Sequence, residues 1–410
     1  MRTDRIRAWD ERLVKLARSI RILGPLSWPD TVEAGFFAAR GRVLPKPPPV
    51  EIDHRETITA LLELRRQIDG EDPVGAFLIR TTDSYREAAE MIQAAHTPTF
   101  TARSVSLYGA PSQPIVPGGP THLDAAEHFI TTTNTAPLGE PRPTMPAEAA
   151  AIWLQEKIDG YFTDKSLPVV LDPHLAALAT AGALRVRLRG GAAYTEQTLR
   201  QLLEHEALVH SATKRNGRAQ PLLTSLGLSA PRTTATQEGL ATLAEMITDT
   251  MDLTRLRRIA LRIEALDAGL SGADFLQVYD IFRAGGQPDT EAYRSAARIF
   301  RGGDVRGGIV FTKDVVYLKG MTTTHTFLLQ AILEGHLDMP ARLFAGRMTL
   351  GDAVLLEPAF KDGTLAAPAV VPDWIVSLPT LAAYLAWAGF SSRIPLGNLS
   401  LSDFTREELS

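Results

Sequence analysis

The sequence predicts an α+β protein that is mainly helical, with a small mixed or antiparallel sheet and a helical N-terminal part. Stretches with the apolar spacing of amphipathic helices recur along most of the chain, whereas the alternation typical of strands is confined to two short stretches, 167–171 and 183–188. The chain has 410 residues, enough to bury a large core, and holds no repeat of solenoid period.

The composition excludes several classes of protein and site. A net charge of -4 lacks the basic excess that would indicate nucleic acid or an anionic membrane as the main partner. The sequence contains 0 cysteines, so any metal ion must be held by histidines and carboxylates. The N-terminus is charged without a signal-like apolar core, and no apolar run reaches about 18 residues. We therefore expect a cytoplasmic protein.

The first part of the chain reads as a helical layer. Residues 1–42 predict two helices separated by a proline-containing break, and 58–68 and 84–95 are further amphipathic helices. Prolines and glycines then cluster between 111 and 148, which predicts a long irregular connection and a domain boundary.

The remaining chain predicts a core with both strands and helices. A helix at 147–161 precedes the two strands, and the second strand leads into a helix at 195–217. Further helices are expected at 237–250, 252–270, 272–284, 291–300 and 325–336. The expected organisation is an N-terminal helical region (1–110), the connection (111–148), a core region (149–345) and a C-terminal region packed on that core (346–410).

The helix expected at 195–217 contains His205-Glu206-x-x-x-His210, and Thr195 is a suitable N-cap. At about 100° per residue, a five-residue step would place the two histidines about 140° apart around a regular α-helix. A π-type turn absorbs one extra residue and returns both imidazoles to one face. If the pair binds a metal ion, the helix must be locally underwound at 207–209.

A hydrolytic zinc site needs a third protein ligand and an open position for water. The stretch Gln237-Glu238-Gly239-Leu240-Ala241 offers a carboxylate, Glu238, in the first turn of a second helix that Thr236 would cap. Gly239 leaves room for a close helix contact. Glu238 is therefore our candidate for the third ligand.

These two motifs together resemble the QEGLA-motif family, which is named in bacteria for flavohaemoglobin expression modulation. Its animal relatives include the microtubule-associated tyrosine carboxypeptidases. Asn216-Gly217, Phe300-Arg301-Gly302 and the stretch 311–318 are also similar to the family pattern, so the likeness spans roughly residues 150–345. Similar His-Glu-x-x-x-His helices, likewise irregular, occur in dipeptidyl peptidase III.

The resemblance implies a zincin-like metallopeptidase catalytic domain with one Zn²⁺ ion. The implied zinc ligands are His205, His210 and Glu238. Glu206 would be the general base that takes the proton of the attacking water and passes it to the leaving amine. The family often has glycine and threonine before the second histidine, whereas this chain has Leu208 and Val209, which bears on pocket shape and substrate preference.

Three further residues have predicted roles around this centre. Tyr317 is the candidate donor to the oxyanion, and Lys313 and Arg301 are candidate substrate-binding residues, with Arg301 placed to clamp a carboxylate. The strand 183–188 is expected to act as an edge strand that pairs with an extended substrate. The predicted substrate is a peptide or protein C-terminal tail, cleaved by a carboxypeptidase-type zinc enzyme.

Two alternatives stay open at this point. The protein could be a zinc-binding regulator without turnover, although Glu206 beside the first histidine argues for catalysis. A basic helix face could attract an acidic tail, or could be a solvated face paired with Glu264 and Asp267, which is the interpretation we favour. That face is formed by Arg255, Arg258 and Arg262.

Overall fold

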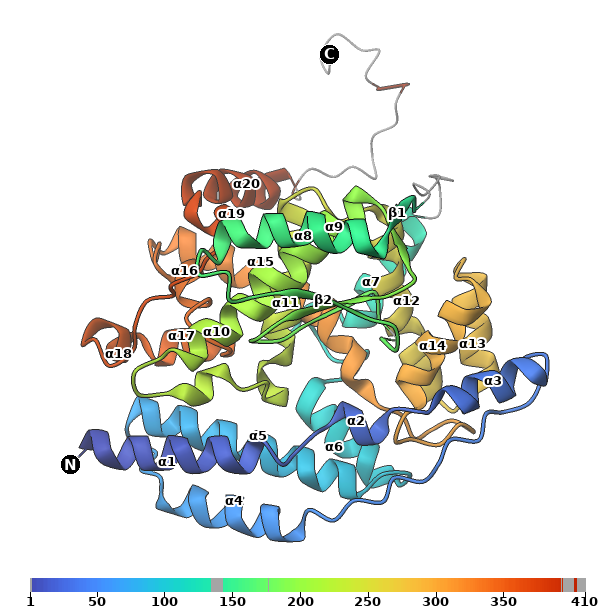
Figure 1. Cartoon of the computed structure of the whole chain (residues 1–410), viewed down its shortest axis with the longest axis horizontal. Coiled ribbons are helices and arrows are strands. Elements are labelled where there is room, and N and C mark those ends of the chain that lie inside the picture. Colours follow the sequence, from blue (N-terminus) through green and yellow to red (C-terminus); the bar gives the residue numbers. More distant parts are fainter. Residues whose placement is uncertain (1, 134–142, 176, 392, 394–401, 404–410) are drawn as a thin grey trace.

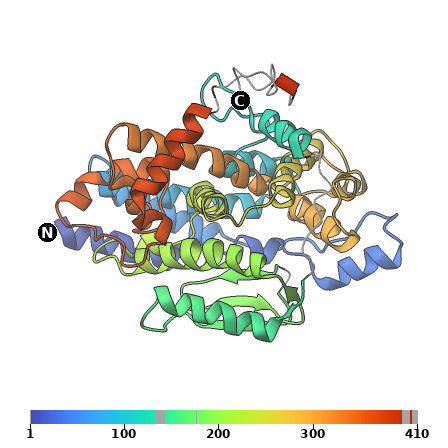
Figure 2. The same cartoon turned by 90° about the horizontal axis from the view of Figure 1, so that it is seen from above.

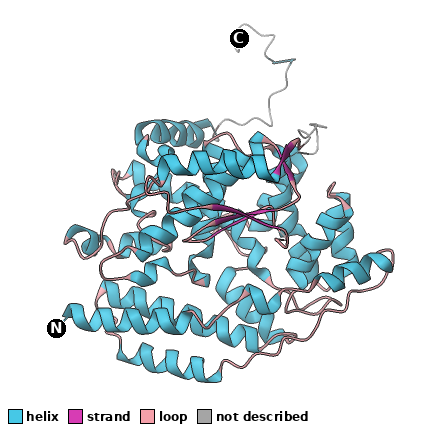
Figure 3. Ribbon diagram, in the orientation of Figure 1, coloured by secondary structure: helices cyan, strands magenta, loops and turns pink. Residues whose placement is uncertain are grey.

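The computed structural model describes residues 2–133, 143–175, 177–391, 393 and 402–403. Helices dominate and the strands are few and short (Figure 3). The fold is thus mainly helical with small sheets, as the sequence predicts. None of the helices in the described part of the chain is both long and apolar enough to cross a membrane.

Apart from the two-residue strand β1, the elements before β2 are helices. The helices are α1 (Arg2–Ala17), α2 (Leu23–Leu26), α3 (Asp30–Ala38), α4 (Arg55–Gln67), α5 (Pro73–Gln93), α6 (Pro98–Tyr108), α7 (His122–Thr133) and α8 (Ala147–Tyr161). The strands are β1 (Met145–Pro146), β2 (Val169–Asp172), β3 (Ala179–Ala181), β4 (Val186–Arg189) and β5 (Ala193–Tyr194). In the N-terminal part, helices α1, α4 and α5 pack side by side (Figure 1).

The elements after the sheets are again helical. They are α9 (Glu196–Leu202), η1 (Leu203–Ser211), α10 (Ala212–Arg218), η2 (Thr224–Gly227), η3 (Pro231–Thr233), α11 (Thr234–Ile247), α12 (Leu253–Leu270), α13 (Phe275–Ala284), α14 (Asp289–Phe300), η4 (Thr312–Asp314), α15 (Val315–Leu333), α16 (Met339–Arg342), α17 (Leu350–Leu355), α18 (Glu357–Lys361), α19 (Asp373–Val376) and α20 (Leu378–Ser391).

The larger sheet has three strands in the order β2-β4-β3, with β2 parallel and β3 antiparallel to β4. It lies between α8 on one face and the continuous helix formed by α9, η1 and α10 on the other (Figure 2). The prediction that 183–188 forms an edge strand is wrong, because β4 is paired on both sides. The edge that faces η1 is β3, whose short Ala-Thr-Ala sequence carries little strand signal.

The buried side chains form two hydrophobic clusters that meet at η1. The smaller cluster contains α8, the sheet and part of η1, including Ala207 and Leu208. The larger cluster extends from Ile6 on α1 to Leu385 on α20 and includes Val209 of η1. The N-terminal helices therefore share one core with α11, α12 and α15.

Three expectations about individual elements are wrong. The expected irregular connection contains α7, because Leu123, Ala126 and Ile130 pack against the larger core and outweigh the nearby prolines. The helix expected at 325–336 instead begins at Val315, since the threonines after Met321 bond back to the helix backbone and do not interrupt it. Thr236, the expected cap of α11, lies inside this helix, which begins at Thr234. Its hydroxyl instead accepts a hydrogen bond from the amide of Leu350 (3.2 Å).

Helices α11 and α15 make a very close contact in the core. A Cβ atom at Gly239 would overlap the carbonyl oxygen of Gly320, and a Cβ at Gly320 would overlap that of Ala235. Both glycines are therefore required by the distance between the two backbones, as the sequence predicts for Gly239.

The close contact at Gly239 predicts how a larger side chain there would affect stability. Gly239→Val should lower the free energy of unfolding by about 2–3 kcal/mol, because the backbones must move apart to admit the side chain. Denaturant unfolding followed by circular dichroism measures this change. The control is Gly160→Ala on α8, where a Cβ meets nothing within 4 Å; that variant should be at least as stable as the parent. Equal effects of the two substitutions would contradict the packing argument.

Candidate active site

The helix that carries the two histidines is underwound where the sequence predicts it. Thr195 caps α9 by accepting from the amide of Thr198 (2.9 Å), and the helix then continues as a π-helix over Leu203–Ser211. Because π-helical bonds join residues five apart, His205 and His210 lie on one face. Their ring centroids are 4.8 Å apart. The predicted local π-type turn is confirmed.

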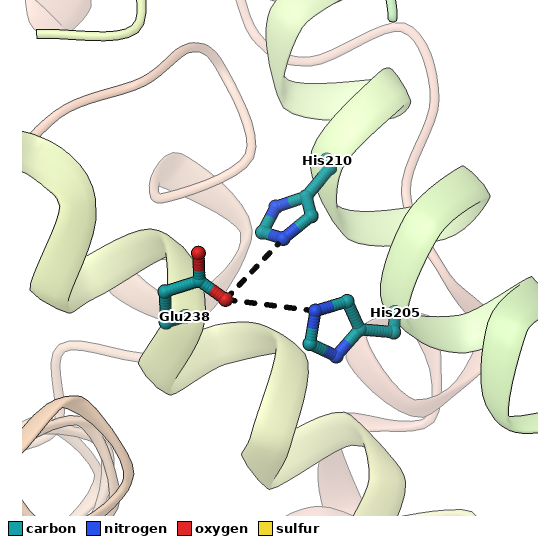
Figure 4. Close-up of side chains that lie close together, drawn as sticks. All are labelled: His205, His210 and Glu238. Carbon is teal, nitrogen blue, oxygen red and sulfur yellow. Dashed lines mark ion pairs between the residues drawn. The ribbon is translucent and has the colours of Figure 1, made fainter. Parts of the chain in front are cut away.

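Glu238 on α11 meets this pair of imidazoles (Figure 4). Its Oε2 atom lies 3.6 Å from Nε2 of His205 and 3.6 Å from Nε2 of His210. The three ligand atoms all lie within 4.8 Å of one another. Among the described residues, no other group of three or more His, Asp or Glu side chains converges closely enough to hold a metal ion.

The donor set fits a divalent cation of the zinc type. Oε2 of Glu238 is buried without a hydrogen-bond partner, although it points between two imidazole nitrogens. Burial raises the pKa of Glu238, but Lys313 and the two imidazoles outweigh it and hold that pKa well below its ordinary value. Two imidazole nitrogens and an ionised carboxylate oxygen are the ligands that zinc takes in proteins without cysteine.

His205 is held in place by a second carboxylate that the sequence analysis missed. Its Nδ1 lies 2.6 Å from Oε1 of Glu245, a fully buried residue on α11. Burial lowers the pKa of His205, but the neighbouring carboxylates of Glu238 and Glu245 raise it to about 10. The Nδ1–H bond to Glu245 leaves Nε2 facing Glu238. The signal was available, because Glu245 follows Glu238 by two helical turns and so lies on the same face.

The basic face of α12 is turned toward this centre. Nε of Arg255 donates to Oε2 of Glu245 (3.0 Å), and the guanidinium of Arg262 lies 4.8 Å from the ring centroid of Tyr317. The interpretation of these two arginines as a solvated face paired with Glu264 and Asp267 is therefore wrong. The charge pattern within α12 could not reveal these contacts, because Glu245 lies on α11 and Tyr317 lies on α15.

All of the residues that the sequence analysis selected line one cavity of about 510 Å³. They are His205, Glu206, His210, Glu238, Arg301, Lys313 and Tyr317. Sequence reasoning gave no role to Gln237, although it begins the motif that contains Glu238, and did not select Tyr108, Arg298 or Arg347 of the same lining. The last three carried no signal, because they come from separate elements and have no common spacing.

Tyr317 stands in a strongly positive environment in the first turn of α15. Arg298, which forms a bidentate ion pair with Asp314 (2.7 Å for each bond), also donates to the Tyr317 hydroxyl at 3.4 Å. Burial raises the pKa of Tyr317, but the neighbouring cations, with Lys313 foremost, lower it below its ordinary value. The hydroxyl is thereby made a stronger hydrogen-bond donor toward the cavity.

Arg301 is a partly buried cation without a carboxylate partner among the described residues. Its guanidinium lies 5.1 Å from the ring centroid of Phe311, and its Nε has no hydrogen-bond partner. Burial and the nearby Arg298 lower its pKa to about 10. Buried guanidinium groups are normally paired, so this one is available for an anionic group that enters the cavity.

A family model described as "Microtubule-associated tyrosine carboxypeptidase" matches residues 34–393. The chain belongs to this family. No curated protein matches the sequence significantly.

Membership in the microtubule-associated tyrosine carboxypeptidase family implies a carboxypeptidase-type activity. The matched segment runs from α3 beyond α20 and contains every residue of the histidine and carboxylate cluster. Residues 2–33, which include α1 and α2, precede it.

The role of Glu245 can be tested by metal binding. Glu245→Gln should weaken zinc affinity about 10–100-fold, because a neutral amide no longer supports the charge and orientation of His205. Competition with a chromophoric chelator measures the affinity, and circular dichroism checks the fold. Glu264→Gln on α12 is the matched control. An unchanged affinity in a folded Glu245→Gln protein would show that Glu245 does not support the metal ligand.

Proposed function

We propose that this protein is a zinc-dependent carboxypeptidase that hydrolyses the last peptide bond of a peptide or protein C-terminal tail. The observation that carries the proposal is that the imidazoles of His205 and His210 converge on Oε2 of Glu238, which is buried and has no hydrogen-bond partner. The same cavity also holds Glu206 and the unpaired Arg301. Family membership supports the reaction class independently.

His205, His210 and Glu238 would hold the zinc ion. When bound, zinc supplies a Lewis acid that polarises the scissile carbonyl and acidifies the attacking water. A set of three protein ligands would leave one zinc position for water or substrate, which is what distinguishes catalytic from structural zinc sites. A zincin-like catalytic domain is part of this proposal.

Glu206 is placed to act as the general base. It lines the cavity beside both histidines and forms no ion pair with another residue in the described ranges. In the proposed reaction, water adds to the carbonyl carbon and Glu206 takes its proton. The carbon–nitrogen bond then breaks, and Glu206 returns the proton to the leaving amine. Tyr317 donates a hydrogen bond to the oxyanion that forms between these steps.

Arg301 would bind the free carboxylate of the substrate, which makes the enzyme an exopeptidase. A guanidinium binds a carboxylate in a bidentate manner, and this one has no competing partner. Lys313 has a second duty, since its Nζ lies 3.7 Å from Oε1 of Glu238 and keeps that ligand ionised. The edge strand β3, with Ala179 and Ala181 in the cavity wall, would pair with the backbone of the substrate.

A peptide that ends in tyrosine is the first substrate to test, because the family description names tyrosine. The competing hypothesis, a zinc-binding regulator without turnover, predicts zinc binding but no peptide cleavage. The unpaired state of Glu206 and Arg301 favours the enzyme, since a regulator has no need to keep a base and a cation unpartnered in the cavity.

The general-base assignment predicts a selective loss of turnover. Glu206→Gln should lower kcat about 10²–10⁴-fold while zinc content stays at one ion per chain, because the amide cannot accept a proton. Release of the C-terminal residue is followed by mass spectrometry. Glu196→Gln, on the exposed side of α9, is the control. Zinc binding without Glu206-dependent cleavage would overturn the peptidase proposal.

The carboxylate clamp predicts an effect on substrate binding. Arg301→Gln should raise KM roughly 100-fold for a peptide with a free C-terminus, because it loses a charge-assisted bidentate contact. The matched substrate is the same peptide with a C-terminal amide, which the parent enzyme should cleave poorly and Arg301→Gln should cleave no worse. A uniform loss on both substrates would assign Arg301 to structure instead.

A further inference from the structure

We infer that residues 18–28, here called the strap, form the wall that selects the side chain of the substrate's C-terminal residue. The inference rests on the proposed carboxypeptidase function and adds a specificity element to it. The strap precedes the segment matched by the family model, which begins at residue 34. Its contribution to the cavity is thus a property of this chain that family membership does not supply.

Three strap residues line the same cavity as the candidate metal centre. They are Ile20, Ile22 and Leu23. Ile20 is 6% exposed, whereas Leu23 at the start of α2 is 41% exposed even though it lines a cavity. A leucine in this situation still has apolar surface to bury, which an entering apolar group would cover.

The strap wall differs in chemistry from the rest of the cavity. Elsewhere the cavity is lined by the candidate metal-binding cluster and by the cationic groups of Arg298, Arg301, Lys313 and Arg347. The strap residues in the lining are all aliphatic, and Ala230 and Pro231 add further apolar lining. A charged side chain placed against this wall would lose its hydration without gaining a partner there, whereas an apolar or aromatic side chain would gain contact area.

The strap passes close to the proposed carboxylate clamp. A Cβ atom at Gly302, the neighbour of Arg301, would lie 2.8 Å from Cδ2 of Leu26. Leu26 itself is buried, but Ile20, Ile22 and Leu23 line the same cavity as Arg301. A C-terminal residue that places its carboxylate on Arg301 can therefore direct its side chain toward the strap. The carboxylate and the side chain belong to one residue, so a cation beside an apolar wall suits a C-terminal residue with an apolar body.

Both ends of the strap are anchored. Before it, α1 buries Leu13 and Ala17 in the larger core. At its other end, the ring of Trp28 packs at 5.7 Å from Phe275 and 6.4 Å from Tyr293, measured between centroids. A segment of this length held on both sides presents its side chains in a fixed position, as selective binding requires.

The test compares peptides that differ only in their last residue, phenylalanine or lysine, with the full-length zinc-loaded protein. Leu23→Asp should lower the ratio of kcat/KM for the phenylalanine peptide to that for the lysine peptide roughly tenfold or more, chiefly through KM. Zinc content and melting temperature should stay at parent values. The matched control is Val116→Asp, a position 43% exposed outside the cavity, which should leave the ratio unchanged.

A second variant covers the case in which Leu23→Asp folds poorly. Leu23→Ala removes contact area without adding charge and should lower the same ratio roughly threefold to tenfold. A ratio that stays at the parent value in a folded Leu23 variant would overturn the role of the strap. Absence of cleavage of both peptides by the zinc-loaded parent protein would instead overturn the proposed function, so the two failures are distinguishable.

Discussion

The π-helical segment Leu203–Ser211 is the constraint on which the site depends, because two histidines five residues apart share one face only there. Such a segment is unfavourable in isolation and needs support from tertiary contacts. It receives that support on two sides, since Ala207 and Leu208 pack into the smaller core while Val209 packs into the larger one. The junction of two cores thus keeps the helix underwound and leaves the imidazoles directed into the cavity.

Pairing of buried charges explains which groups around the cavity are structural and which are free to react. Glu245 is neutralised by Arg255 and His205, and Asp314 is neutralised by Arg298. Burying these carboxylates is tolerable because each has a partner at hydrogen-bond distance. Arg301 departs from this pattern in the described part of the chain, and an unpaired, partly buried cation is a cost that binding of an anionic ligand removes.

The sequence predicts what is local and misses what depends on distant pairing. The π-type turn and the meeting of His205, His210 and Glu238 follow from spacing along one helix and from one short motif on a second. The order of the strands could not be predicted in this way. β4 is central because β3 pairs with it, and β3 consists of small residues that give only a weak strand signal. The partner of Arg255 was equally out of reach, since Glu245 lies on another helix and its burial is a tertiary property.

The strap and the candidate metal centre are separate in their bonding although they share a cavity. No hydrogen bond or ion pair between described residues joins residues 18–28 to His205, His210 or Glu238. These candidate ligands are instead fixed by Glu245 and by the close contact of α11 with α15 at Gly239. Changes in the strap can therefore alter which side chain fits the cavity while the ligand geometry stays intact. Under the proposed function, substrate preference can diverge in this family without loss of the chemistry.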